Sequence, residues 1–186
     1  MGFYDDMAQV TRDLMDPELS HRIAHLLERH RLTPERLVLE ITESAIMDDP
    51  QRALQTLERL HGLGVKLSID DFGTGYSSLA YLKRLPVDEL KIDQSFVKHM
   101  ETDLDDAKIV RSTIDLAHNL GLSVVAEGVE TAKAWKLLAG LNCDEIQGYF
   151  VAKPMPADTL ADWLTQWQPP DTDDEVLATE FSAMLD

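Results

Sequence analysis

The stretch Ser68-Ile69-Asp70-Asp71-Phe72-Gly73-Thr74-Gly75-Tyr76-Ser77-Ser78 organises the interpretation of the whole chain. The residues just before it (65–69) alternate between apolar and polar side chains, which predicts a β-strand. Two adjacent carboxylates follow where this strand should end, and then comes a loop with two glycines that can lead into a helix. Neighbouring carboxylates repel each other unless something offsets their charge. A hard divalent cation bound by oxygen would do so, and a solvated turn is the alternative.

The composition limits the classes of function. With 186 residues the chain suits one domain, and its 44% apolar and 27% charged residues are typical of a globular protein. The net charge of −17 and the lack of a basic patch argue against a partner such as DNA, RNA or an anionic membrane. A phosphate ester as ligand would therefore need a metal ion to supply positive charge.

The sequence predicts a cytoplasmic protein. Its one cysteine, Cys143, excludes an internal disulfide framework and fits a reducing compartment. There is no run of about 18 apolar residues and no basic-then-apolar signal pattern at the N-terminus, so we expect no membrane segment in this chain.

Apolar runs alternate with helix signals along the chain. Capping residues and apolar stripes begin helices at Asp16-Pro17-Glu18, Asp49-Pro50 and Asp105-Asp106, and others are expected near 79–82, near 131–140 and after Pro156. Five runs are predicted as strands: 37–42, 65–69, 89–93, 122–130 and 145–150. This alternation predicts an α/β fold with a parallel sheet. Beyond Trp167 the composition shifts to an acidic, flexible tail (169–186), while residues 1–9 match no element.

Polar side chains occur within or near the C-terminal end of every predicted strand. Because the ends of parallel strands converge on one face, we expect a shared site there. Acids in apolar strands need a partner or a metal, so the set suits two oxygen-bound divalent ions, with salt-bridged core residues as the alternative. The residues are Glu40, Asp70, Asp71, Lys91, Asp93, Glu127, Glu130 and Gln147.

Two other patterns in the sequence are weaker. His21 and His25 have metal-ligand spacing, but their charged neighbours favour a surface helix over a zinc site. Gly73-x-Gly75-x-x-Ser78 resembles a dinucleotide-binding loop, but its third glycine is replaced by serine. The two carboxylates before that loop would also repel a pyrophosphate.

Five ordered strings resemble the EAL domain family: LEITES (39–44), DDFGTGYSSL (70–79), LPVDELKID (85–93), VVAEGVE (124–130) and CDEIQGYFVAKPMP (143–156). Members of this family are bacterial phosphodiesterases that hydrolyse cyclic di-GMP to linear pGpG with Mg²⁺ or Mn²⁺. The resemblance implies a signalling domain over residues 10–168 with a TIM-like (β/α) barrel fold. About five βα units are present, so the barrel is expected to be incomplete.

The resemblance also implies roles for individual residues. Glu40 resembles a direct metal ligand, Asp70 resembles the carboxylate that bridges two metals, and Asp71 is expected to hold the second metal. Lys91 matches a lysine near the attacking water, and Glu127 matches an acid that assists the metal and the water.

The remaining roles concern the substrate and a loop. Glu130, Gln147 and Asp93 are expected to support the site and the substrate. Glu43 resembles the residue that anchors the loop containing Gly73, Thr74 and Gly75, which in this family shapes the metal site and the dimer interface.

The sequence also departs from the family pattern. It contains no Glu-Ala-Leu motif, and the position of an expected asparagine ligand, 32 residues before Glu40, is Ala8. These departures predict weak or absent hydrolysis by this chain alone, with a non-catalytic cyclic di-GMP-binding or protein-interaction domain as the alternative. An open barrel exposes a strand edge, which predicts a homodimer or completion by another chain.

Overall fold

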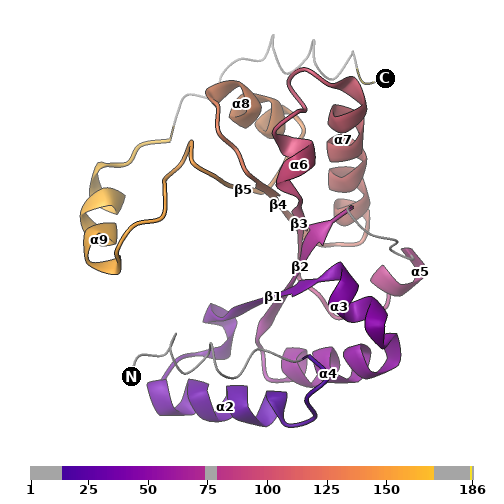
Figure 1. Ribbon diagram of the computed structural model, residues 1–186. Helices are drawn as coiled ribbons and strands as arrows, with labels where there is room; N and C mark the ends of the chain where they lie inside the picture. The colour runs from indigo at the N-terminus through magenta and orange to yellow at the C-terminus, as the bar shows by residue number, and fades with distance from the viewer. Residues whose placement is uncertain (1–13, 74–78, 170–184, 186) are drawn as a thin grey trace. The chain divides into compact units, whose positions relative to one another are not determined.

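The computed structural model describes residues 14–73, 79–169 and 185, and it has the α/β fold that the sequence predicts (Figure 1). The strands follow one another in the sheet in chain order, β1-β2-β3-β4-β5. The pairs β1–β2 and β4–β5 are parallel. The strands are β1 (Val38–Thr42), β2 (Lys66–Phe72), β3 (Glu89–Ile92), β4 (Ser123–Glu127) and β5 (Glu145–Gln147).

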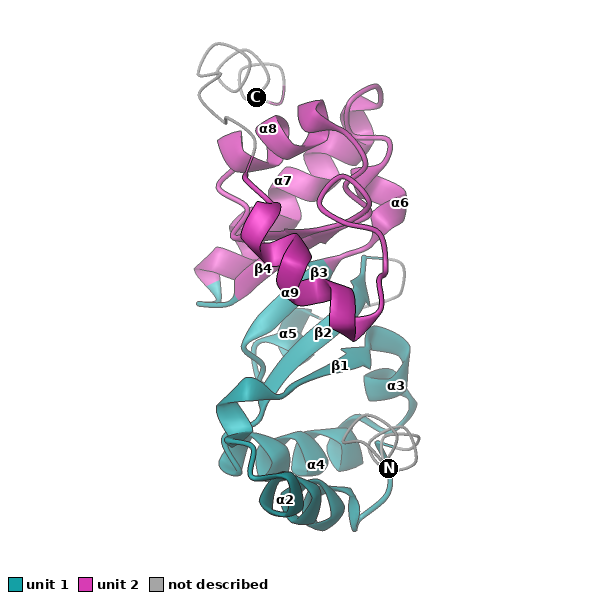
Figure 2. Ribbon diagram, turned by 90° about the vertical axis from the view of Figure 1, so that its left-hand side faces the viewer, with its two compact units in different colours: residues 1–91, 120–122 teal, residues 92–119, 123–186 magenta. Residues whose placement is uncertain are grey.

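Helices alternate with these strands along the chain. They are α2 (Leu19–His30), η1 (Pro34–Arg36), α3 (Glu43–Asp48), α4 (Pro50–Gly62), α5 (Leu79–Leu82), α6 (Gln94–Val97), α7 (Leu104–Asn119), α8 (Ala132–Gly140) and α9 (Ala157–Gln166). The chain divides into two compact units (Figure 2). Unit 1 contains residues 1–91 and 120–122, and unit 2 contains residues 92–119 and 123–186.

The core of unit 1 lies between its helices and strands. The side chain of Asp49 accepts a hydrogen bond from the backbone N–H of Arg52 at 3.3 Å, so it caps α4 as predicted. The helix α4 packs against both β2 and α2. The buried apolar side chains at these contacts include Ile23, Leu57 and Leu67. Their burial on one face of each helix is the reason for the apolar stripes in the sequence.

The core of unit 2 is built in the same way. The helices α6 and α7 pack on β4, where Val110, Ile114 and Val124 are almost fully buried. Thr131 caps α8 by accepting the backbone N–H of Ala134 at 3.0 Å. Trp135, Trp163 and Trp167 pack together with Phe150 in an aromatic cluster, with ring centroids 5.7 to 6.2 Å apart.

Two predicted helix starts are wrong by one or more residues. α2 begins at Leu19, because the carboxylate of Asp16 accepts the N–H of Glu18 at 2.9 Å in a turn that precedes the helix. α7 begins at Leu104, because Asp103, which precedes the predicted cap, accepts the N–H of Asp105 at 2.9 Å.

Several elements differ from prediction for local reasons. The strand β2 continues through both aspartates to Phe72, and the short helices α3 and α6 were not predicted. β4 ends before Gly128, whose φ of +72° is outside the strand region, and β5 ends before Gly148.

The structure also bears on the histidines and on membrane segments. His21 and His25 are both exposed, and His21 lies 3.3 Å from the carboxylate of Glu18, which supports the surface-helix interpretation. Apart from Pro169 and Leu185, the predicted acidic tail lies outside the described residues. Among the helices in the described part of the chain, none has the length and apolarity needed to cross a bilayer.

Candidate active site

A buried lysine joins two carboxylates at the strand ends of unit 1. Lys91 Nζ, from β3, lies 2.8 Å from Glu40 Oε1 on β1 and 3.1 Å from Asp70 Oδ1 on β2. The parallel register pairs Asp70 with Thr42, the last residue of β1, while Glu40 is the central residue of that strand. Three residues that are far apart in the sequence therefore form one charged group, as the strand-end argument predicts.

The three side chains of this group differ in how far they are buried. The side chain of Lys91 is 4% exposed and that of Asp70 is 23% exposed, whereas that of Glu40 is 52% exposed. Glu40 is more exposed because β1 is the first strand in the sheet order and has β2 as its neighbour.

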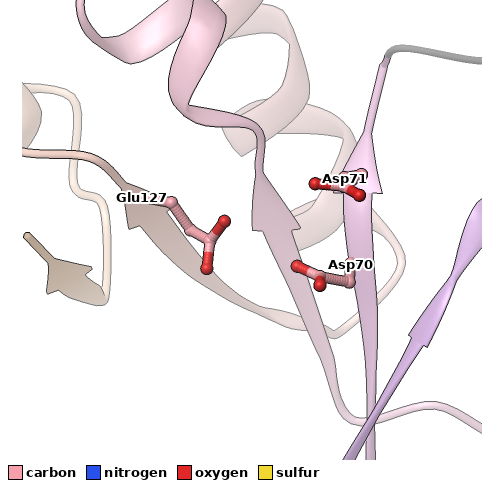
Figure 3. Close-up of side chains that lie close together, drawn as sticks. All are labelled: Asp70, Asp71 and Glu127. Atoms are coloured by element: carbon pink, nitrogen blue, oxygen red, sulfur yellow. The ribbon is translucent and has the colours of Figure 1, made fainter.

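Asp71 has an unusual backbone conformation next to this group. Its φ is +56°, in the left-handed region that non-glycine residues rarely occupy. Figure 3 shows Asp70 and Asp71 on consecutive positions of β2 near its C-terminal end. Strained residues of this kind are concentrated at functional sites. The conformation turns the second carboxylate out of the regular alternation of the strand.

The donor set in unit 1 fits a hard divalent cation. Glu40, Asp70 and Asp71 offer only carboxylate oxygens, the ligands that Mg²⁺ and Mn²⁺ prefer. Their three negative charges exceed the single positive charge of Lys91 by two. A divalent cation would neutralise that excess, so the residues present are chemically suited to one.

Unit 2 contains a polar cavity of about 350 Å³ at the ends of its strands. Glu127 is at the C-terminal end of β4 (Figure 3). It lines the cavity together with Glu130 and Gln147, so the structure brings three predicted residues of this unit together. The other lining residues were not predicted: Gln94, Lys98, Gly128, Gly148 and Tyr149.

Lys98 is the basic residue among those lining this cavity. Its Nζ lies 3.2 Å from Glu130 Oε1. The sequence argument searched for polar residues at the ends of strands. Lys98 follows the short helix α6 and belongs to no strand, so that argument missed it. It could therefore be found only from the packing of α6 against β4.

Two glycines allow the backbone around this cavity to approach closely. A Cβ atom at Gly148 would lie 2.2 Å from the carbonyl oxygen of Val129, and one at Gly128 would lie 2.5 Å from the Cβ of Gln94. Val129 in turn donates its N–H to the carbonyl of Gln147 at 3.1 Å. Larger residues at either glycine would force the cavity wall apart.

Asp93 has a structural contact. Its Oδ1 accepts the backbone N–H of Ser95 at 2.9 Å and caps α6. Asp93 is not among the residues that line the cavity of unit 2. The predicted contact of Asp93 with substrate stays a prediction.

Glu43 is buried although it carries a carboxylate. It is 6% exposed, and among the described residues neither of its carboxylate oxygens has a hydrogen-bond partner. Its surroundings include Ile46, Ile69 and Tyr81. Of the loop that Glu43 is predicted to anchor, Gly73 has a φ of +99°, whereas Thr74 and Gly75 lie outside the described residues.

The chain is similar to known proteins in both sequence and structure. The family model of the EAL domain matches residues 8–154. The bifunctional diguanylate cyclase/cyclic di-GMP phosphodiesterase MucR of Pseudomonas aeruginosa is 50% identical over 138 residues. That match covers 74% of this chain and 20% of MucR, so the chain spans about a fifth of this curated relative.

Solved structures give the same result. The PaMucR phosphodiesterase in complex with c-di-GMP is similar with a TM-score of 0.77 and 48% identity, over 79% of this chain and 60% of that chain. Klebsiella pneumoniae BlrP1, solved with manganese and cy-diGMP, is similar with a TM-score of 0.70 and 32% identity, over 75% of this chain and 36% of that chain. These similarities confirm the predicted fold class, an incomplete TIM-like (β/α) barrel. The chain belongs to the EAL domain family.

Proposed function

We propose that this chain is a domain for the metal-dependent hydrolysis of cyclic di-GMP to pGpG in bacterial second-messenger signalling. The observation that carries the proposal is the group of Glu40, Asp70 and Lys91 at adjacent strand ends, next to Asp71. The relative MucR is named as a cyclic di-GMP phosphodiesterase, and its phosphodiesterase was solved with c-di-GMP. Both the family and the donor chemistry therefore favour this reaction.

The cofactor in this proposal is a pair of Mg²⁺ or Mn²⁺ ions held by Glu40, Asp70 and Asp71. The similar structure of BlrP1 with manganese supports the choice of a divalent metal. Bound divalent ions would supply charge neutralisation on the phosphate and would lower the pKa of a water molecule for in-line displacement.

The other residues act on the substrate and the water. The ammonium of Lys91 orients the attacking water or a phosphate oxygen, and the carboxylate of Glu127 assists that water. Glu130 and Gln147 contact the nucleotide, since both line the cavity of unit 2. In the reaction the water oxygen forms a bond to phosphorus, the P–O bond to the leaving 3′ oxygen breaks, and that oxygen takes up a proton. Glu43 keeps its predicted role as anchor of the loop that begins at Gly73.

A second candidate function is cyclic di-GMP binding, or binding of a protein partner, without turnover. It is favoured because Ala8 occupies the position of the expected asparagine ligand. For the same reason we expect weak turnover by this chain alone. A homodimer, or completion by another chain, is part of the proposal, and 44% exposure of Val38 on β1 supports it. The compartment proposed is the cytoplasm.

The direct test is turnover of cyclic di-GMP by the purified chain, with Mg²⁺ or Mn²⁺ and with EDTA, followed by chromatography of pGpG. The variant Asp70→Asn removes one proposed metal ligand and is expected to lower the rate at least about 100-fold. Asp162→Asn, on the exposed surface of α9, is the matched control and should keep the rate of the unchanged chain.

The outcomes separate the two candidates. Metal-dependent pGpG formation that is lost in Asp70→Asn supports the phosphodiesterase. Binding of cyclic di-GMP by calorimetry, with no pGpG from a folded sample, supports the binding domain. Neither binding nor turnover by a folded sample would contradict both.

A further inference from the structure

Lys91 is the most deeply buried charged side chain of the site in unit 1. Its side chain is 4% exposed, yet its ammonium contacts two carboxylates, Glu40 at 2.8 Å and Asp70 at 3.1 Å. An ammonium has three donors and can serve both carboxylates at once. Burial strengthens the contact with Asp70, because little water screens it, whereas the contact with Glu40, which is 52% exposed, is screened more.

We propose that Lys91 is the internal counter-ion that keeps Glu40 and Asp70 in position when no divalent cation is bound. Without it, the carboxylates of Glu40 and Asp70, which are two register positions apart on adjacent strands, would repel each other and work against the pairing of β1 with β2. In this role Lys91 lets the strand ends fold before a metal arrives. This stabilising role is separate from any contact that Lys91 makes with the attacking water.

The side-chain charges of the site in unit 1 explain why it can hold both Lys91 and a divalent cation. Glu40, Asp70 and Asp71 carry three negative charges and Lys91 carries one positive charge, so the group retains an excess of two. The excess negative charge attracts a divalent cation. Lys91 keeps this excess small enough that repulsion does not separate the strands. If Lys91 is removed, a divalent cation becomes the main source of positive charge. The part of the inference that concerns a metal rests on the proposed function, and the part that concerns the metal-free protein does not.

The first measurement is the thermal midpoint of the whole chain in EDTA. Lys91→Met keeps the length of the side chain and removes its charge, and we expect a midpoint lower by about 5–10 °C. Lys66→Met is the matched control, since Lys66 is an exposed lysine at the start of β2, and it should stay within about 2 °C. Equal midpoints for the two variants would overturn the inference.

A double variant separates charge from packing. In EDTA, Asp70→Asn/Lys91→Met should regain at least about half of the midpoint lost in Lys91→Met, because one of the opposed charges is gone. This comparison remains decisive if Lys91→Met alone does not fold, since the double variant should then fold. A double variant no more stable than Lys91→Met would show that Lys91 acts through packing, and the inference would fail.

The second measurement adds saturating Mn²⁺. We expect the midpoint of Lys91→Met to rise by more than that of the unchanged chain, because the ion then replaces the missing ammonium. An equal rise in both proteins would overturn the link between the lysine and the metal. No rise in either protein would contradict the metal site of the proposed function, while the counter-ion role would still be decided by the EDTA series.

Discussion

At the scale of single residues, Cys143 shows how surroundings control chemistry. Its Sγ lies 3.3 Å from the carbonyl oxygen of Glu145 and 3.7 Å from that of Val124. Burial raises the pKa of the Cys143 thiol to about 12, and the nearby charge of Asp144 acts in the same direction. The thiol therefore stays protonated at physiological pH.

We predict that the Cys143 thiol in the folded chain reacts with a disulfide reagent at pH 8 roughly 1,000-fold more slowly than in the urea-unfolded chain. The factor follows from the raised pKa, because only the thiolate attacks. Absorbance of the released thiolate measures both rates, and free cysteine in urea controls for the effect of the solvent. Similar rates in the two states would contradict the buried, protonated thiol.

The site in unit 1 shows which properties of individual residues could be predicted from the sequence. The types and positions of Glu40, Asp70 and Lys91 follow from acids and a lysine near the ends of apolar runs. Their exposures, from 4% for Lys91 to 52% for Glu40, do not follow from the sequence. Exposure depends on which strands flank each residue, and this is a property of the sheet.

At the scale of elements, the same aspartate contact recurs before two strands. Asp88, just before β3, accepts the backbone N–H of Leu67 at the start of β2 at 2.9 Å. Asp144, just before β5, accepts the backbone N–H of Val124 at the start of β4 at 2.8 Å. Each aspartate thus satisfies a donor at the beginning of a neighbouring strand and helps to fix its register.

Asp144 is further held by His118, whose Nε2 lies 2.8 Å from the same carboxylate oxygen. Burial acts to raise the pKa of Asp144, but the hydrogen bonds from His118 and Val124 outweigh it and hold the pKa below its ordinary value of 3.8. A lowered pKa means that the folded chain favours the charged carboxylate. The stability it contributes is present above the ordinary pKa and is lost as the pH falls through the folded value.

We predict that Asp144→Asn lowers the thermal midpoint by about 2–4 °C at pH 6 to 7, because a charge-assisted hydrogen bond is lost. The difference from the unchanged chain should shrink as the pH falls below the ordinary value of 3.8 toward the lowered folded pKa, because the unfolded carboxylate is protonated first. Calorimetry across this range measures it, with Asp162→Asn as an exposed control. A difference that stays constant down to pH 3 would contradict the role of the ionised Asp144 carboxylate as a hydrogen-bond acceptor.

At the scale of the whole molecule, the acidic excess is the dominant electrostatic property. The chain has 34 acidic and 17 basic side chains and a net charge of −17. Such a charge favours solubility but destabilises a compact state through self-repulsion. Salt shortens the range of this repulsion from about 30 Å at 0.01 M to about 10 Å at 0.1 M.

We therefore predict that raising NaCl from about 0.01 M to 0.3 M in EDTA increases the thermal midpoint by a few degrees, through screening. The measurement is a thermal scan at constant pH, and a neutral sugar at equal osmolality controls for exclusion effects. A midpoint that falls with salt would mean that surface ion pairs, such as that of Lys98 with Glu130, outweigh the net repulsion.

The family and the main elements of this protein follow from the order of its amino acids alone. Five ordered strings carry the family, and caps such as Asp49 and apolar stripes such as that of α2 are local signals that need only a few neighbouring residues. The sequence did not reveal α3 and α6, because helices of one or two turns are too short to show a period.

Which of the predicted residues meet, and how far each is buried, depends on how the elements pack together. Lys91 is 51 positions from Glu40 and 21 from Asp70, and their contact exists because strands pair side by side. Packing likewise decided that Lys98 lines the cavity of unit 2 and that Leu160 and Leu164 on α9 are exposed. The physical reason is that periodicity and capping act within one element, whereas burial and ion pairing depend on elements that are distant in the chain.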